Sequence, residues 1–170
     1  MSISVRSSSE VAWDDVRTVF GTKGDPARCW CQWFKVTNAD WESSSPAQFE
    51  RMLCDQVREA PVAPGLVAYL DGEPVGWVAV EARTGYRRIT SMKVAAARPE
   101  PQGDPAVWAV TCFVVRVGYR KKGVSAALLA GAVDHARAHG ARLLEAYPVD
   151  VAEKKTSSAD LFHGALSTFL

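Results

Sequence analysis

Residues 106–140, AVWAVTCFVVRVGYRKKGVSAALLAGAVDHARAHG, contain the patterns of a strand, a basic turn and a helix in direct succession. Residues 107–117 are almost uniformly apolar and rich in β-branched side chains, which predicts a central strand covered on both faces. A helical pattern follows, and Gly140 stands where helices often end. The apolar face of this helix comprises Val124, Leu128, Ala132, Val133 and Ala136. The turn is therefore expected at a helix N-terminus.

The turn at residues 118–125, GYRKKGVS, combines features that bind phosphate. The first N–H groups of a helix lack intrahelical partners and lie at the positive end of its dipole, so they attract anions. Glycine at position 123 leaves room for a phosphate beside the backbone. A nucleoside-triphosphate loop would need Lys where Val124 stands, so we set that class of site aside. The basic residues of the region are Arg116, Arg120, Lys121 and Lys122.

The spacing Arg120-x-x-Gly123-x-Ser125 resembles motif A of the GNAT superfamily of acyl-coenzyme A transferases. That motif has Gln or Arg first, Gly three residues later, and Gly or Ala two residues after that, so Ser125 is a small departure. The resemblance implies that amides of this turn hold the coenzyme pyrophosphate, and that residues 113–115 pair with its pantetheine arm like an added strand. The implied coenzyme-binding residues are Phe113, Val114, Val115, Arg120, Lys121, Lys122, Gly123, Val124 and Ser125.

Length, charge and cysteine content narrow the function classes. A chain of 170 residues with 48% hydrophobic residues is expected to form one domain, residues 1–170. A net charge of +1 favours neither a nucleic-acid partner nor a membrane surface. We expect a cytoplasmic protein, since no signal peptide or membrane-spanning run is apparent. The four cysteines lack the spacing of a zinc site, so we expect reduced thiols and no metal.

Patterns before the central strand predict two helices and three strands. Residues 3–7 are expected to form an edge strand, and Ser8 or Ser9 to cap the first helix. A capping box at residues 45–48 starts the second helix. Residues 71–72, Asp-Gly, join two strands in an antiparallel hairpin.

Two segments have no regular pattern. Residues 21–45 are expected either to fill the core with aromatic side chains or to form a wall of an acceptor site. Residues 83–105 are expected either to flank the active cleft or to form a disordered surface loop. The aromatic side chains of the first segment are Trp30, Trp33, Phe34 and Trp41.

Beyond the central unit, residues 143–149 predict a strand parallel to the central one, because a helix connects the two. A last helix is expected, capped by Ser157 or Ser158. The resulting order, β-α-α-β-β-β-α-β-α, is that of the GNAT fold, an α/β fold with a mixed central sheet. The inner face predicted for the last helix comprises Phe162, Ala165, Leu166 and Phe169.

Two departures from the GNAT pattern concern the end of the sequence. Members usually carry Asn and Tyr around the last helix, the Tyr as general acid, where Phe162 and Phe169 stand here. The family also continues into further strands beyond the position of Leu170. The strand at 143–149 would then have an open edge, and we expect a second protomer to cover it as a homodimer.

The resemblance implies acetyl transfer from acetyl-CoA to an amine acceptor, a primary amine of a small molecule or protein. The ammonium must first lose a proton. Glu145 is the first candidate for the base and Glu81 the second; burial of Glu145 without a cationic partner would raise its pKa, whereas a salt-bridged carboxylate is the alternative. Tyr147, on the same strand face as Glu145, is the candidate acid. The oxyanion donor is expected near the N–H of Val115. A non-catalytic acyl-coenzyme A binding module is the other function left open.

Overall fold

The computed structural model describes residues 1–93, 98–150 and 163–170. A mixed sheet organises them, with the strands in spatial order β1-β2-β3-β4-β5. All neighbours are antiparallel except β4 and β5, which are parallel. The strands are β1 (Ile3–Ser7), β2 (Gly65–Leu70), β3 (Glu73–Ala82), β4 (Val107–Val115) and β5 (Leu143–Ala146). The mixed sheet, the edge strand at 3–7 and the hairpin are thereby confirmed.

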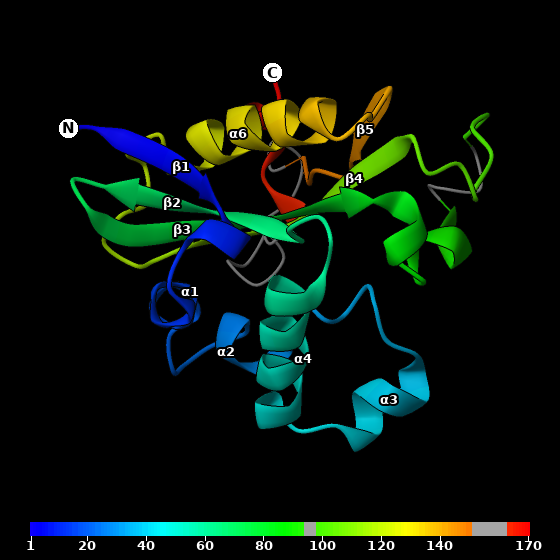
Figure 1. Ribbon diagram of the computed structural model, residues 1–170, viewed down its shortest axis with the longest axis horizontal. Helices are drawn as coiled ribbons and strands as arrows, with labels where there is room; N and C mark the ends of the chain where they lie inside the picture. The colour runs from blue at the N-terminus through cyan, green and yellow to red at the C-terminus, as the bar shows by residue number, and fades with distance from the viewer. Residues whose placement is uncertain (94–97, 151–162) are drawn as a thin grey trace.

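The helices cover the two faces of the sheet, as Figure 1 shows. On one face lies α6 (Val124–Ala138), and on the other lie α1 (Trp13–Phe20), α2 (Pro26–Cys29) and α4 (Pro46–Glu59). Four of the five predicted core residues of α6 are buried, and Val133 is only partly buried. A Cβ at Gly76 would lie 2.7 Å from Val124 Cγ1, so glycine in β3 lets the start of α6 approach the sheet closely. The buried residues of α6 are Val124, Leu128, Ala132 and Ala136.

The region before β2 contains two more helices than predicted. α2 and the short α3 (Asn38–Ser43) lie between α1 and α4, within the segment whose pattern was irregular. The predicted serine cap of α1 is wrong, because the helix begins at Trp13 after Ala12 and residues Ser8–Glu10 form a 3₁₀ turn instead. The capping box of α4 is confirmed: Ser45 Oγ accepts from the Gln48 N–H at 3.3 Å, and Gln48 Oε1 accepts from the Ser45 N–H at 2.7 Å.

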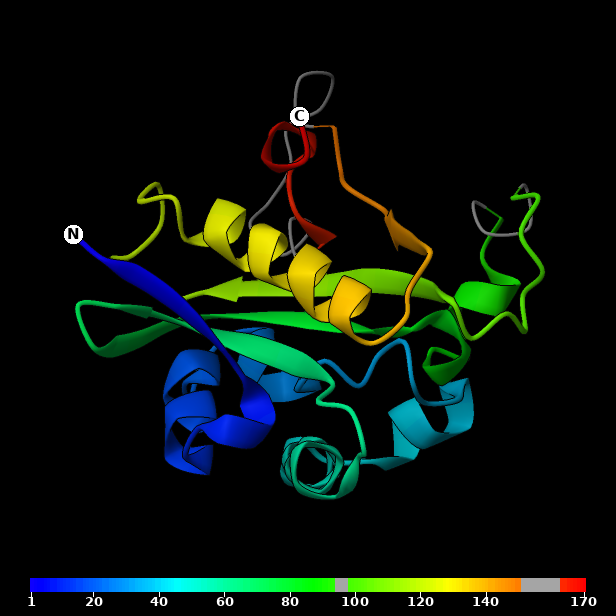
Figure 2. The same cartoon turned by 45° about the horizontal axis from the view of Figure 1, so that its top comes forward.

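The described C-terminal residues lie beside β4 and β5 (Figure 2). Val149 and Ala165 form a parallel bridge, and Leu166–Thr168 form a 3₁₀ turn. The predicted helix is therefore wrong for residues 165–169; its cap at 157–158 and Phe162 lie outside the described residues.

β4 and β5 separate partway along β4. The parallel ladder joins residues 107–110 of β4 to residues 143–146 of β5 and ends there. At the same point Thr111 is the extra residue of a β-bulge, because Val110 pairs with Val80 and Cys112 pairs with Ala79. From Cys112 to Val115, β4 pairs with β3 on one side; on the other side, residues 111–115 have no strand partner among the described residues.

The helices of the described ranges include none with both the length and the hydrophobicity needed to cross a membrane.

Candidate functional site

The turn between β4 and α6 is shaped by left-handed backbone conformations. Gly118, Lys121 and Gly123 have φ values of 91°, 60° and 80°. Gly123 is the N-cap of α6 and makes no side-chain cap. Throughout the described part of the chain, no oxygen accepts a hydrogen bond from the amides of residues 123–126. These four N–H groups are therefore available to an anion.

The side chains around this turn are basic and mostly exposed. Arg120, Lys121 and Lys122 are exposed, and Arg120 Nε donates to the Val115 carbonyl at 3.4 Å, at the end of β4. Two cations lie near the ring of Tyr119, with Arg116 Cζ at 5.1 Å and Lys122 Nζ at 5.3 Å from its centroid. The space beside Gly123 is open, since a Cβ there would meet only Ile3 Cδ1, at 3.9 Å. The predicted residues 120–125 thus form the end of the turn and the first residues of α6, where exposed cations and amides without a partner in the described structure lie beside open space.

The predicted β4 residues lie at the edge that β5 leaves unpaired. Phe113 and Val114 are buried on opposite faces of the sheet, and Val115 is partly exposed. The Phe113 ring packs edge-on against Phe169, with centroids 5.9 Å apart. A Cβ at Gly164 would lie 3.3 Å from the Phe113 ring, so the C-terminal segment rests on this side chain.

Glu145, the first candidate for the base, is buried with a cationic partner. Its side chain is 0% exposed, and Oε1 lies 2.8 Å from Nη1 of Arg83, which is also buried. Its other oxygen accepts a hydrogen bond of 2.6 Å from the Tyr147 hydroxyl. The condition on which we expected a raised pKa, burial without a cation, is not met. The alternative of a salt-bridged carboxylate is what the structure contains.

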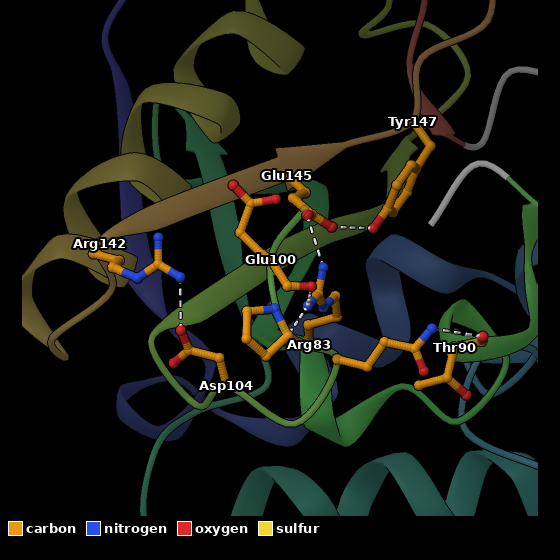
Figure 3. Close-up of polar contacts among 9 residues, drawn as sticks. Arg83, Thr90, Glu100, Asp104, Arg142, Glu145 and Tyr147 are labelled. Atoms are coloured by element: carbon orange, nitrogen blue, oxygen red, sulfur yellow. Dashed lines mark hydrogen bonds and ion pairs between the residues drawn. The ribbon is translucent and has the colours of Figure 1, made fainter. Parts of the chain in front are cut away.

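The Tyr147 side chain lies beside the Glu145 carboxylate, and its hydroxyl donates a hydrogen bond to it (Figure 3). It is partly exposed and follows Ala146, the last residue of β5 that pairs with β4. Burial, and then the hydrogen bond to Glu145, raises the pKa of its phenol. The alternation predicted from the sequence, with Glu145 and Tyr147 on one face, is confirmed by this bond.

Glu81, the second candidate, also has a cationic partner. Lys35 Nζ lies 2.5 Å from Glu81 Oε2, and both side chains are largely buried. Lys35 Nζ also donates to Gln56 Oε1 of α4 and lies 5.7 Å from the centroid of the Tyr86 ring. Burial, and next the charge of Glu81, raises the pKa of Tyr86.

The aromatic segment 21–45 fills the core in part, as one of the two alternatives predicted, and its other aromatic side chains lie at the surface. Trp30 and Phe34 are buried, and Trp30 stacks on Phe20 with centroids 4.8 Å apart. Trp33 is 37% exposed and packs edge-on against Trp41. The guanidinium of Arg88 lies 3.7 Å above the Trp33 ring, beside a surface hollow. The residues lining this hollow are Val36, Thr37, Asn38, Arg87, Arg88 and Ser91.

The described parts of the segment 83–105 are tied to the sheet. Arg83 Nη2 donates to the carbonyls of Glu100 and Pro101, at 3.3 and 2.6 Å. Asp104 Oδ2 accepts from Arg142 at 2.7 Å, just before β5 (Figure 3). Sequence reasoning assigned no role to Arg83. Its position directly after an apolar strand favours a buried, paired arginine, but nothing in the local pattern identifies Glu145 as its partner.

The cysteines are free thiols, and Cys31 and Cys112 are buried. Burial raises the pKa of Cys31, and it raises that of Cys29 to about 12. In the described ranges, no group of three or more His, Cys, Asp or Glu side chains could hold a metal ion.

Solved structures of other proteins share this fold at low sequence identity. AAC(6')-Iy in complex with the bisubstrate analog CoA-S-monomethyl-acetylneamine is 14% identical, with a TM-score of 0.52, over 90% of this chain and 84% of that one. A transcriptional regulator from Bacillus halodurans C-125 is 12% identical, with a TM-score of 0.51, over 89% and 85%. An N-acetyltransferase from Staphylococcus aureus Mu50 is 14% identical, with a TM-score of 0.50, over 85% and 72%.

A search among curated proteins finds no significant match. The sequence model of the acetyltransferase (GNAT) family matches residues 30–164, which include β4, the basic turn, α6 and β5. The chain therefore belongs to the GNAT family of acetyltransferases.

Proposed function

We propose that this protein is an N-acetyltransferase that moves an acetyl group from acetyl-CoA to a primary amine of a small molecule or protein. The observation that carries the proposal is the junction of β4 and α6. The amides of residues 123–126 have no partner in the described structure. They follow the last part of β4, whose edge β5 leaves unpaired. Amides and exposed cations suit the pyrophosphate, and the strand edge suits an amide-bearing arm that adds to the sheet. The donor-binding residues proposed are those predicted, Phe113–Val115 and Arg120–Ser125.

The chemistry requires proton transfer near the place where β4 and β5 separate. The attacking amine must become neutral, and the leaving thiolate must gain a proton. We propose Glu145, Glu81 and Tyr147 for this chemistry. Tyr147 is the one of the three that follows the end of the β4–β5 ladder directly. Neither carboxylate is unpaired, since Arg83 and Lys35 neutralise them.

This pairing favours a second candidate function, a non-catalytic acyl-coenzyme A binding module. A carboxylate that holds an ion pair is a weaker base, because neutralising it breaks the pair. The two candidates predict the same donor binding but opposite results for turnover.

The test is to mix the protein with acetyl-CoA and a panel of primary amines, including amino acids, polyamines, aminoglycosides and peptides with a free N-terminus or lysine. Release of free thiol is followed with a chromogenic disulfide. The transferase is supported by amine-dependent thiol release and an acetylated product in mass spectrometry. Binding of acetyl-CoA without turnover on any amine would refute it and leave the binding module.

The outer edge of β5 has no strand partner among the described residues. We propose that a second copy of the chain covers it. Light scattering at micromolar concentration should give a dimer mass, and a monomer mass would refute this part.

A further inference from the structure

Three side chains form a continuous chain of polar contacts from the interior toward the end of the β4–β5 ladder. Arg83 Nη1 contacts Glu145 Oε1 at 2.8 Å, and the Tyr147 hydroxyl donates to Glu145 Oε2 at 2.6 Å. Figure 3 shows a dashed line from the Glu145 carboxylate to each of the other two side chains. Each oxygen of the carboxylate thus has its own donor.

The three side chains differ in their exposure to solvent. The side chains of Arg83 and Glu145 are 1% and 0% exposed, so Glu145 itself cannot meet an acceptor amine. Tyr147 is partly exposed and packs against a cluster formed by Phe34, Tyr86, Ile89 and Ala109. Along this hydrogen bond, a proton that moves between the exposed side of Tyr147 and Glu145 Oε2 passes through the Tyr147 hydroxyl.

A contribution to stability does not by itself explain why Arg83, Glu145 and Tyr147 are joined in this way. A buried ion pair loses much of its attraction to the cost of removing both charges from water, and apolar side chains of the same size often replace such pairs without loss of stability. Arg83 does hold the segment 83–105 through the carbonyls of Glu100 and Pro101. That purpose requires a counterion for the buried Arg83 charge, but it does not require the phenol that donates to the second oxygen of the carboxylate.

We propose that Tyr147 and Glu145 form a single proton shuttle for the acetyl transfer, with Arg83 as the positioning residue that holds Glu145. The inference rests on the proposed N-acetyltransferase function. It assigns the base and the acid to one connected pair rather than to two independent groups.

The shuttle returns every proton that it takes up, so the two residues end in the protonation states in which they began. The amine nitrogen bonds to the thioester carbonyl carbon, and its proton moves to the Tyr147 oxygen while the Tyr147 hydroxyl proton moves to Glu145 Oε2. The C–S bond then breaks, and the same route in reverse delivers a proton to the sulfur. The sum is an amide and a free thiol, with no other reactant. A phenol that stays protonated at neutral pH can donate and accept in this way, and the raised pKa of Tyr147 keeps it protonated.

The shuttle predicts a specific pattern in mutant kinetics. Tyr147→Phe should lower kcat by about 100-fold, the lower end of the range for general acid–base groups, with the KM for acetyl-CoA within about threefold. Glu145→Gln should lower kcat comparably. The double variant should be no slower than Tyr147→Phe alone, because the two residues act as one unit. Multiplying effects would overturn the shuttle.

A matched control exists elsewhere in the chain. The Tyr69 hydroxyl donates to Asp15 Oδ2 at 2.7 Å, and burial and this hydrogen bond raise the pKa of its phenol as well. Tyr69 lies on β2, which is separated from β4 by β3. Tyr69→Phe removes the same kind of bond and should leave kcat within about twofold.

The role of Arg83 is tested with Arg83→Lys, which keeps the positive charge but loses the planar fork. It should lower kcat by about tenfold when Tyr147 is present and have no further effect in the Tyr147→Phe background, as expected for a residue that acts through another. A merely structural role would lower kcat equally in both backgrounds and would overturn the assignment. If Arg83→Lys does not fold, Glu145→Gln takes its place in the same cycle.

The experiment measures thiol release with the best amine of the panel, together with a titration of acetyl-CoA binding and thermal unfolding for every variant. Turnover by wild type with Tyr147→Phe within threefold of it would overturn the shuttle and leave the transferase function intact. Binding of acetyl-CoA by wild type without turnover on any amine would overturn the transferase function and the shuttle together.

Discussion

Replacing Arg83 with Met breaks the most deeply buried ion pair of the described structure. The Arg83 and Glu145 side chains are 1% and 0% exposed, and their closest N and O atoms lie 2.8 Å apart. Removing one partner leaves an uncompensated buried charge, which costs about 3–5 kcal/mol in the free energy of unfolding. In a chain of 170 residues each 1 kcal/mol lowers Tm by about 2–4 °C, so we expect Arg83→Met to lower Tm by about 10 °C.

Thermal unfolding by circular dichroism, with urea unfolding beside it, measures this loss. Arg83→Met/Glu145→Leu removes both charges and should recover most of the stability, because no unpaired charge remains. Arg137→Met is the surface control: its pair with Asp134 is more than 70% exposed on both sides and should contribute almost nothing. A single variant within about 1 kcal/mol of wild type would refute the reasoning. A double variant less stable than Arg83→Met would also refute it.

Three further predictions concern a helix cap, acid stability and a buried thiol. Ser45→Ala removes the acceptor for the Gln48 N–H and should cost about 1 kcal/mol of unfolding free energy by urea titration; an unchanged midpoint would count against the cap. The hydrogen bond from Arg142 lowers the pKa of Asp104, so its contribution is present above the ordinary Asp pKa of about 3.9 and is lost as pH falls through the lowered value. Asp104→Asn should therefore make stability fall less steeply below about pH 4, and parallel acid-unfolding curves would argue otherwise. Because burial raises the pKa of Cys31, it should resist a thiol reagent at pH 8 until the protein unfolds; rapid labelling of native protein, located by mass spectrometry, would contradict this.

Local patterns predicted the elements whose signals lie within a few residues. The strand before the basic turn, the apolar face of α6 and the capping box of α4 were all readable from spacing, because neighbouring residues determine them. Alternation also placed Glu145 and Tyr147 on one face. Central β4 ends at Val115 rather than at residue 117, since the left-handed turn begins soon after it.

What sequence reasoning missed depends on contacts between distant residues. Arg83 and Glu145 are 62 positions apart, and no local pattern links them. The Lys35–Glu81 pair is similar, because it joins the aromatic segment to β3. The 3₁₀ turn at Leu166–Thr168 replaces a predicted helix because this segment bridges to Val149 and packs on β4, so tertiary contacts override the helical spacing.

We propose to measure the affinity for acetyl-CoA of two variants, Gly123→Glu and Gly140→Glu. The comparison tests whether the start of α6 holds the donor pyrophosphate. Both glycines have positive φ, 80° and 85°, and they lie at opposite ends of α6, so both variants carry similar backbone strain and the same added charge. Isothermal titration calorimetry should show the Kd of Gly123→Glu raised by at least about tenfold, or 1.4 kcal/mol, and that of Gly140→Glu within about twofold of wild type. Equal affinities of Gly123→Glu and wild type would contradict the account.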